Sequence, residues 1–295
     1  MRDFVAVDWG TSSLRAARID GSGQVLAQRA SERGILTVPV GGFPGVLEEI
    51  CGDWLLESAT LCLVSGMAGS RQGWREAPYV ACPAGFAEIA QGLSWVEPRR
   101  IALVPGLCCE LRGVPDVLRG EEVQVFGAMD LLGEREGVFV LPGTHSKWVQ
   151  VRNGRVQSFA TFMTGELYAL LRQHSILART LPAEHGTLEE EAFTRGVLHA
   201  RETASLLHAA FSTRTLALFG RLPAQALGSY LSGLVIGEEL RMRDPAVRSV
   251  VLIGSPALTQ RYALALRTLG CTSRVLGDQA SWRGLWALAQ TLELP

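Results

Sequence analysis

Short apolar runs separated by glycine-containing turns open the chain and recur near its middle. The pattern predicts two matching three-strand units, with strands at residues 4–8, 14–18 and 24–29, and again at 138–141, 147–151 and 156–161. Asn153-Gly154, between the last two of these strands, favours a type I′ turn. The sequence therefore predicts a strand–turn–strand unit used twice, about one domain apart.

Helical spacing of apolar residues accounts for most of the remaining chain. It predicts helices at 43–57, 121–132, 165–172, 188–211, 224–243, 257–269 and 282–291, and short buried strands at 61–64, 101–104 and 250–253. Residues 65–85 contain four glycines and two prolines without a sustained period, which is typical of a structured loop that carries binding residues. We expect an α/β protein with two domains, 1–133 and 134–295, with packing of the last helix back onto the first domain as one option.

Bulk composition narrows the classes of function. The chain is 47% hydrophobic and 19% charged with a formal net charge of −1, which describes a globular protein without a general field for nucleic acid or an anionic membrane. No run of 18 apolar residues and no signal-peptide pattern is present. The six cysteines form no C-x-x-C pair, which favours reduced thiols in the cytoplasm, and we expect Cys108-Cys109 to be buried filler.

The two three-strand units share a tetrad between their first and second strands. It reads Gly10-Thr11-Ser12-Ser13 in the first unit and Gly143-Thr144-His145-Ser146 in the second. Tight turns of this kind expose backbone N–H groups that bind anionic oxygens. One copy is weak evidence, but two copies facing each other across a cleft would hold successive phosphates of one nucleotide.

Three charged residues lie beside these loops. Asp8 precedes the first loop, where a carboxylate would position Mg²⁺ or its waters, although a turn acid making Asx hydrogen bonds is the alternative. Lys147 follows the second loop and is the chain's only lysine, since the other 27 of the 28 basic residues are arginines. Because a tight site does not accept guanidinium for ammonium, Lys147 is a candidate phosphate contact; chance survival is the alternative. Arg15 is either a phosphate or substrate contact or a solvated strand residue.

The order of these residues resembles the actin-like ATPase superfamily. Asp8-x-Gly10-Thr11-Ser12-Ser13-x-Arg15 resembles its first phosphate motif, and Gly143 to Lys147 occupy the second phosphate position. The stretch "VVLIGSPALTQRYALAL" resembles the adenosine motif, with Gly254, Ser255 and Pro256 as the expected adenosine contacts; an ordinary strand-to-helix turn is the alternative. The resemblance implies a two-domain actin-like fold with ATP and Mg²⁺ bound in an interdomain cleft.

Longer segments resemble the 2-dehydro-3-deoxygalactonokinases along nearly the whole chain. They are "DWGTSSLRA", "GMAGSRQGWREAPYVACPAG", "LRGEEVQVFGA", "LPGTHSKWV", "TFMTGELYALL" and "LFGRLPAQALGSYLSGLVIGEEL". Ser13 departs from the asparagine expected in that family, and Leu141-Pro142 replaces the acid that opens the second phosphate motif elsewhere in the superfamily. The resemblance implies ATP-dependent phosphorylation of the 6-hydroxyl of 2-dehydro-3-deoxy-D-galactonate in galactonate catabolism.

Related sugar kinases place the catalytic base at the start of the helix before the second hairpin. Here Glu121 holds that place, with Glu122 and Asp116 as alternatives, and both glutamates also fit a role as helix N-terminal charges. With Asp8 and Lys147, Glu121 completes the predicted catalytic set.

The substrate is a sugar acid, so a forked arginine should pair with its carboxylate. The candidates are Arg71, Arg75 and Arg119, of which Arg71 is favoured, and Trp74 and Tyr79 are expected to form apolar walls.

Three other functions remain open at this level. A kinase for another 2-keto-3-deoxy sugar acid, such as the gluconate epimer, differs by one inverted hydroxyl that the sequence barely addresses. A regulatory clamp that hydrolyses ATP would need an interaction surface rather than the acceptor pocket that loop 65–85 suggests. A phosphatase would act without ATP. The expected partners are a small sugar acid and ATP, and a homodimer stays open.

Overall fold

The computed structural model describes residues 3–56, 60–184 and 186–292, and it divides into two compact units. Unit 1 combines Met1–Gly137, Val149–Ala160 and Asp278–Pro295, and unit 2 combines Val138–Trp148 and Thr161–Gly277. Each unit is thus assembled from stretches that lie far apart in the sequence.

A six-stranded mixed sheet forms the centre of unit 1, in the order β3-β2-β1-β4-β7-β6. Its strands are β1 (Phe4–Trp9), β2 (Leu14–Ile19), β3 (Val25–Ser31), β4 (Cys62–Gly66), β6 (Ser94–Glu97) and β7 (Ile101–Leu103). Strand β1 pairs antiparallel with β2 and parallel with β4, and its apolar run is buried on both faces, as expected of a central strand. The parallel pairing places Asp8 beside Ser65 near the carboxyl ends of these two strands.

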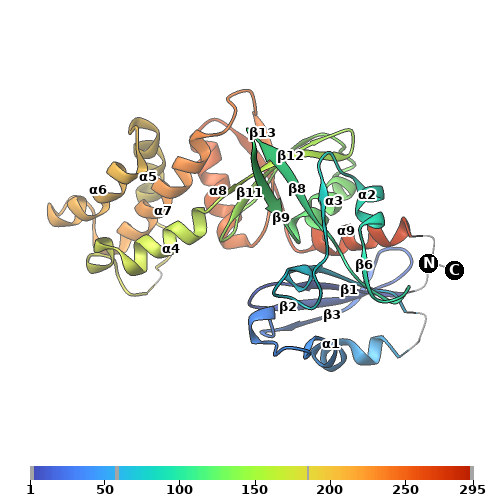
Figure 1. The fold of residues 1–295 in the computed structure, drawn as a ribbon. Coiled ribbons are helices and arrows are strands. Elements are labelled where there is room, and N and C mark those ends of the chain that lie inside the picture. Colours follow the sequence, from blue (N-terminus) through green and yellow to red (C-terminus); the bar gives the residue numbers. More distant parts are fainter. Residues whose placement is uncertain (1–2, 57–59, 185, 293–295) are drawn as a thin grey trace. The chain divides into compact units, whose positions relative to one another are not determined.

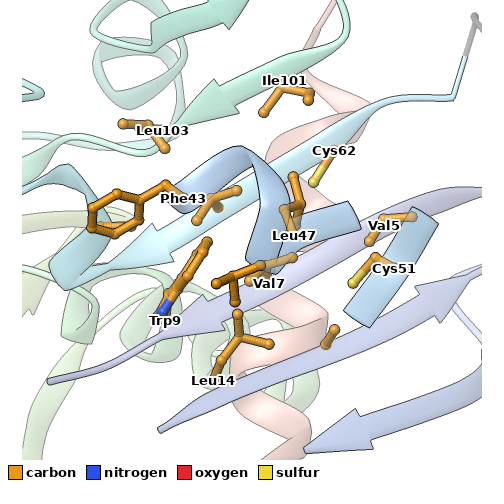
Figure 2. Packing of buried hydrophobic residues seen from close by; sticks show 14 of the residues in the cluster. Val5, Val7, Trp9, Leu14, Phe43, Leu47, Cys51, Cys62, Ile101 and Leu103 are labelled. Atoms are coloured by element: carbon orange, nitrogen blue, oxygen red, sulfur yellow. The ribbon is translucent and has the colours of Figure 1, made fainter. Parts of the chain in front are cut away.

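Helix α1 (Phe43–Cys51) supplies the apolar cover for this sheet. Its residues Phe43, Val46, Leu47 and Cys51 are buried in one cluster with side chains of β1, β2, β4 and β7, as Figure 2 shows. The indole of Trp9 lies 5.2 Å from the Phe43 ring, centroid to centroid. This packing fixes the end of β1, from which the first candidate phosphate loop departs.

Two helices of unit 1, α3 (Glu121–Leu132) and α9 (Gln279–Gln290), lie side by side (Figure 1). A Cβ atom on Gly127 would lie 1.8 Å from the Ala280 carbonyl oxygen, and one on Gly284 would lie 1.8 Å from that of Val123. Glycine at both positions therefore allows the two backbones to touch. Unit 1 also contains helix α2 (Phe86–Gln91), which contacts α9, and a three-stranded sheet of β5 (Tyr79–Ala81), β8 (Gly106–Leu111) and β9 (Val114–Leu118).

A five-stranded sheet, in the order β12-β11-β10-β13-β14, holds the second three-strand unit. Its strands are β10 (Gly137–Leu141), β11 (Ser146–Arg152), β12 (Arg155–Phe162), β13 (Ser249–Ile253) and β14 (Thr272–Leu276). Between β12 and β13 the chain is helical, with α4 (Thr164–His174), α5 (Glu190–Glu202), α6 (Leu206–Leu218) and α7 (Ala224–Arg241), and α8 (Pro256–Thr268) follows β13. Helix α7 is buried at 13 of its 18 residues and packs against α5 in Figure 1.

Both predicted three-strand units are confirmed, as is the predicted helix 121–132. Asn153 and Gly154 have φ angles of 55° and 72°, as a type I′ turn requires. No helix in the described part of the chain has the length and apolar character to cross a membrane.

Several local predictions were wrong. The single helix predicted at 188–211 is two helices, because the chain turns extended at Thr203, whose hydroxyl donates to the His199 carbonyl oxygen, and α6 begins only after Ser205. Strands β5, β6, β8, β9 and β14 were missed; they are short and partly exposed, so their apolar pattern is weak. The six-residue helix α2 was missed as well. Cys108 and Cys109 on β8 are half-buried rather than buried.

Candidate active site

The first candidate phosphate loop is a tight turn between β1 and β2. The Gly10 N–H donates to the Ser13 carbonyl oxygen at 2.8 Å, and the side chains of Thr11, Ser12 and Ser13 are exposed. Gly34 packs behind the loop so closely that a Cβ atom there would lie 2.3 Å from the Thr11 carbonyl oxygen. The loop is therefore supported from behind and presents its hydroxyl groups to the outside.

Asp8 and Arg15 face each other across β1 and β2. An Arg15 Nη2 to Asp8 Oδ2 distance of 2.5 Å joins them, and Arg15 Nη1 lies 2.6 Å from Asp278 Oδ1, just before α9. Arg15 is therefore not simply a solvated strand residue, since two carboxylates of unit 1 hold its guanidinium beside the loop. No cluster of three or more metal-binding side chains occurs in the described ranges. A single carboxylate such as Asp8 still fits Mg²⁺, which commonly takes one or two carboxylates and completes its shell with phosphate oxygens and water.

The second candidate phosphate loop, residues 142–145, joins β10 to β11. Lys147 is 5% exposed, and its ammonium donates to the His145 carbonyl oxygen at 3.1 Å, so it stabilises the backbone of the loop from the buried side. The start of α4 packs against the same loop. The Glu166 N–H donates to the Thr144 carbonyl oxygen at 3.0 Å, and the Glu166 carboxylate lies 2.5 Å from His145 Nε2.

Gly165 is required for this packing of α4. A Cβ atom at Gly165 would lie 2.4 Å from the Gly143 carbonyl oxygen, so any side chain would push the helix away from the loop. The sequence did not point to α4 as part of the site, because a glycine one residue inside a helix is usually unremarkable.

The predicted adenosine motif is the turn from β13 into α8. Gly254 has a φ angle of 155°, and its N–H donates to the Leu276 carbonyl oxygen at 3.2 Å. Ser255 and Pro256 are exposed at the start of α8. A cavity of about 220 Å³ within unit 2 is lined by Gly143 of the second loop together with side chains of α4, α7 and α8, including Arg261 and Tyr262.

The acids at the start of α3 occupy two different environments. Glu121 is partly exposed and accepts a hydrogen bond from the Arg119 N–H at 3.0 Å. Glu122 is fully buried and accepts from the Gly120 N–H at 2.6 Å. Burial, followed by the nearby charge of Glu121, raises the pKa of Glu122 to about 8. Asp116, on β9, is partly exposed and accepts from the Val117 N–H.

The three candidate arginines for the sugar-acid carboxylate differ in burial. The Arg71 side chain is 87% exposed, and Arg75 donates to the Trp95 carbonyl oxygen at 2.5 Å. Arg119 is 8% exposed, donates to the Ala77 carbonyl oxygen at 2.8 Å, and lies 4.4 Å above the centre of the Tyr79 ring.

Two further N–H groups of Arg119, on Nε and Nη1, are buried without a hydrogen-bond partner among the described residues. The structure thus brings Arg119 and Tyr79 together. Trp74 packs with Phe43 and Trp9 in the core of unit 1, at 6.2 Å and 6.4 Å between ring centroids.

Two hairpins of matching form, each beside a parallel strand of a mixed sheet, give this α/β protein the fold of the actin-like ATPases. The chain aligns over 98% of its length with (R)-2-hydroxyglutaryl-CoA dehydratase component A of Acidaminococcus fermentans, covering 96% of that chain. The TM-score is 0.54 and the identity 13%, a likeness of fold alone.

The chain belongs to the 2-keto-3-deoxy-galactonokinase family, whose model matches residues 8–288. It is 36% identical over 293 residues to the 2-dehydro-3-deoxygalactonokinase of Escherichia coli (strain K12), with 98% of each chain covered. A crystal structure of a Sinorhizobium meliloti protein, provisionally described as a 2-dehydro-3-deoxygalactonokinase, aligns with a TM-score of 0.92 at 38% identity, covering 99% of this chain and 100% of that one. The family resemblance stated from the motifs is confirmed.

Proposed function

We propose that the protein transfers the terminal phosphoryl group of ATP to the 6-hydroxyl of 2-dehydro-3-deoxy-D-galactonate. The products are ADP and 2-dehydro-3-deoxy-6-phospho-D-galactonate, a step of D-galactonate catabolism. The observation that carries the proposal is the similarity to a named kinase over 98% of both chains. The first Gly-Thr-x-Ser loop is exposed at Thr11 to Ser13 and the second at Thr144 and His145, and such loops are the parts that a phosphoryl-transfer enzyme needs for its nucleotide.

In this proposal the loops Gly10–Ser13 and Gly143–Ser146 bind phosphate oxygens through backbone N–H groups and through the hydroxyls of their exposed residues. The Ser146 side chain, predicted from the sequence as a phosphate contact, is buried instead and donates its hydroxyl to Glu239. Lys147 holds the backbone of the second loop and adds positive charge beneath it. Arg15 orients the Asp8 carboxylate. Mg²⁺, when bound beside Asp8, would neutralise charge on the phosphates.

Glu121 is the proposed group that orients the 6-hydroxyl and accepts its proton. It is partly exposed, whereas Glu122 is enclosed and has a pKa of about 8. Glu121→Gln should bind ATP normally and lose about 10²- to 10⁴-fold in turnover. Glu122→Gln and Asp116→Asn are the matched comparisons, and wild-type turnover in Glu121→Gln would remove Glu121 from the mechanism.

The carboxylate of the sugar acid is proposed to pair with an arginine of unit 1. Arg71 was favoured from the sequence, but burial supports Arg119, because unpaired buried N–H groups are costly and a ligand oxygen would satisfy them. Arg119→Lys keeps the charge and removes the fork, so it should raise the KM for the sugar acid at least about tenfold and leave the KM for ATP unchanged. Arg71→Ala is measured beside it, and equal effects on both KM values would contradict a carboxylate role for either residue.

The deciding experiment is a coupled assay of ADP release with Mg-ATP and a panel of acceptors. The panel contains the 2-keto-3-deoxy acids derived from galactonate and gluconate, the two parent aldonates and a sample without acceptor. Turnover with the galactonate-derived acid alone supports the proposal, and preferential turnover with the gluconate-derived acid would reassign the substrate. ADP release that ignores every acceptor would instead support an ATP-hydrolysing clamp.

We propose a cytoplasmic location, which the use of ATP and a catabolic sugar acid in the proposed reaction supports. A homodimer remains a prediction, to be tested by sedimentation of the purified protein.

A further inference from the structure

A buried carboxylate that the mechanism has not used lies at the centre of unit 2. Glu239, near the end of α7, is 3% exposed, and its two oxygens accept four hydrogen bonds. Oε1 accepts from the Ser146 hydroxyl at 2.8 Å and from Trp148 Nε1 at 2.7 Å. Oε2 accepts from the Tyr262 hydroxyl at 2.6 Å and from the Thr164 hydroxyl. One side chain thus joins three elements, β11, α4 and α8, to α7.

These donors come from the parts of unit 2 that surround the second loop. Ser146 is the last residue of the Gly-Thr-His-Ser tetrad, and Thr164 is the first residue of α4. Tyr262 lies on α8, the helix that follows the predicted adenosine turn. Helices α4 and α8 both contact α7 (Figure 1). Glu239 is therefore the common acceptor for the loop and both helices.

Neutral hydrogen-bonding groups surround both oxygens of the Glu239 carboxyl. All four are neutral groups, and the Trp148 indole can only donate, so Oε1 has to accept. Burial leaves the pKa of Glu239 raised, although the hydrogen bonds from Thr164, Tyr262, Trp148 and Ser146 act in the opposite direction. These contacts restrict the rotamers of the three hydroxyl side chains that bond to Glu239.

Two of the four donors also line the 220 Å³ cavity of unit 2. Thr164 and Tyr262 lie on its wall together with Gly143 of the second loop, Gly165 and Arg261. Because Glu239 bonds the hydroxyls of both Thr164 and Tyr262, it links α4 to α8 at this wall. Loss of one acceptor oxygen would free both helices to move relative to Gly143.

We propose that Glu239 is a positioning residue for the nucleotide: it holds the second phosphate loop, the start of α4 and the middle of α8 in the arrangement that binds ATP. The inference rests on the proposed function in one respect, namely that the second loop binds a nucleotide. It assigns Glu239 no contact with ATP or the sugar acid. The signature of such a residue is a change in nucleotide affinity without a matching change in affinity for the sugar acid.

The test is Glu239→Gln, which keeps the side-chain volume and replaces one acceptor oxygen by an NH₂ group that cannot accept. Binding of Mg-ADP is measured by calorimetry, and the KM values for ATP and the sugar acid are measured by the coupled assay. We expect Mg-ADP affinity to fall and the KM for ATP to rise by about tenfold or more, with the KM for the sugar acid within about twofold of wild type. Tyr262→Phe, which removes one of the four donors, should give a smaller change of the same kind.

Tyr230→Phe is the matched control. Tyr230 is also a buried residue of α7, and its hydroxyl pairs with Ser212 at 2.7 Å, outside the loop and the 220 Å³ cavity. This variant should lower the melting temperature and leave Mg-ADP binding unchanged. If Glu239→Gln behaves like Tyr230→Phe, with lower stability and wild-type nucleotide affinity, the positioning role is overturned. Should Glu239→Gln fail to fold, wild-type affinity in folded Tyr262→Phe overturns it equally.

Failure of the proposed function has a different signature. Wild-type protein that binds Mg-ADP but phosphorylates no sugar acid would remove the kinase proposal. The comparison of Mg-ADP affinity among the variants would still decide the role of Glu239.

Discussion

Replacing Glu122 by glutamine should change how the stability of unit 1 depends on pH. Glu122 is fully buried at the start of α3, and its pKa is raised from 4.5 to about 8, first by burial and then by the charge of Glu121. Between these two pKa values the folded protein holds a proton that the unfolded chain has released. The stability contributed by the protonated group is therefore complete below about pH 4.5 and is lost as the pH rises towards 8.

The size of the effect follows from linkage. One bound proton changes the free energy of unfolding by about 1.4 kcal/mol per pH unit, so wild-type protein should lose about 2 to 3 kcal/mol between pH 5.5 and 7.5. Glu122→Gln cannot ionise and should lack this loss. The free energy of unfolding of the variant, relative to that of the wild type, should therefore rise by about 2 to 3 kcal/mol between pH 5.5 and 7.5.

Urea denaturation followed by tryptophan fluorescence measures this difference. Six of the seven tryptophans belong to unit 1, with Trp148 as the exception, so the signal reports mainly on the unit that contains Glu122. Glu88→Gln is the control, because the Gly85 N–H and then Arg155 lower the pKa of the Glu88 carboxyl, which stays ionised throughout this range. Glu88→Gln should shift stability equally at every pH. If the free energy of unfolding depends on pH in the same way in wild type and Glu122→Gln, the raised pKa of Glu122 is refuted.

Three further outcomes are expected from close contacts in the structure. Gly165→Ala would place Cβ 2.4 Å from the Gly143 carbonyl oxygen, so it should raise the KM for ATP at least about tenfold while the KM for the sugar acid stays constant; equal KM values for ATP would contradict the contact. Lys147→Arg should also weaken ATP binding, measured by calorimetry, because a broad guanidinium replaces an ammonium that is 5% exposed; unchanged affinity would favour chance survival of the lysine. Gly127→Ala would place Cβ 1.8 Å from the Ala280 carbonyl oxygen and should lower the free energy of unfolding, measured by urea denaturation, by about 1 to 3 kcal/mol. An unchanged free energy of unfolding would contradict the contact between α3 and α9.

The parts of the site that the sequence could predict are those encoded by neighbouring residues. The first loop lies within six residues of Asp8, and the Asn153-Gly154 turn has the positive φ angles that its dipeptide favours. Burial of Arg119 was not predictable in the same way. Its partner Ala77 lies 42 residues away, and among 27 arginines nothing local marks the one that folds inward.

For Glu239, in contrast, the sequence indicates that a long-range contact exists, although it does not identify the partners. Its donors Ser146, Thr164 and Tyr262 are 93, 75 and 23 residues away, so no motif joins them. Helix α7 is nevertheless apolar or small around almost its whole circumference, which is typical of a buried helix. A carboxylate on such an enclosed helix is removed from water, and a buried polar group of this kind is tolerated only where hydrogen-bond donors contact it. The physical inference from an enclosed helix to a cluster of donors was therefore available before the structure, whereas the identity of the donors required the fold.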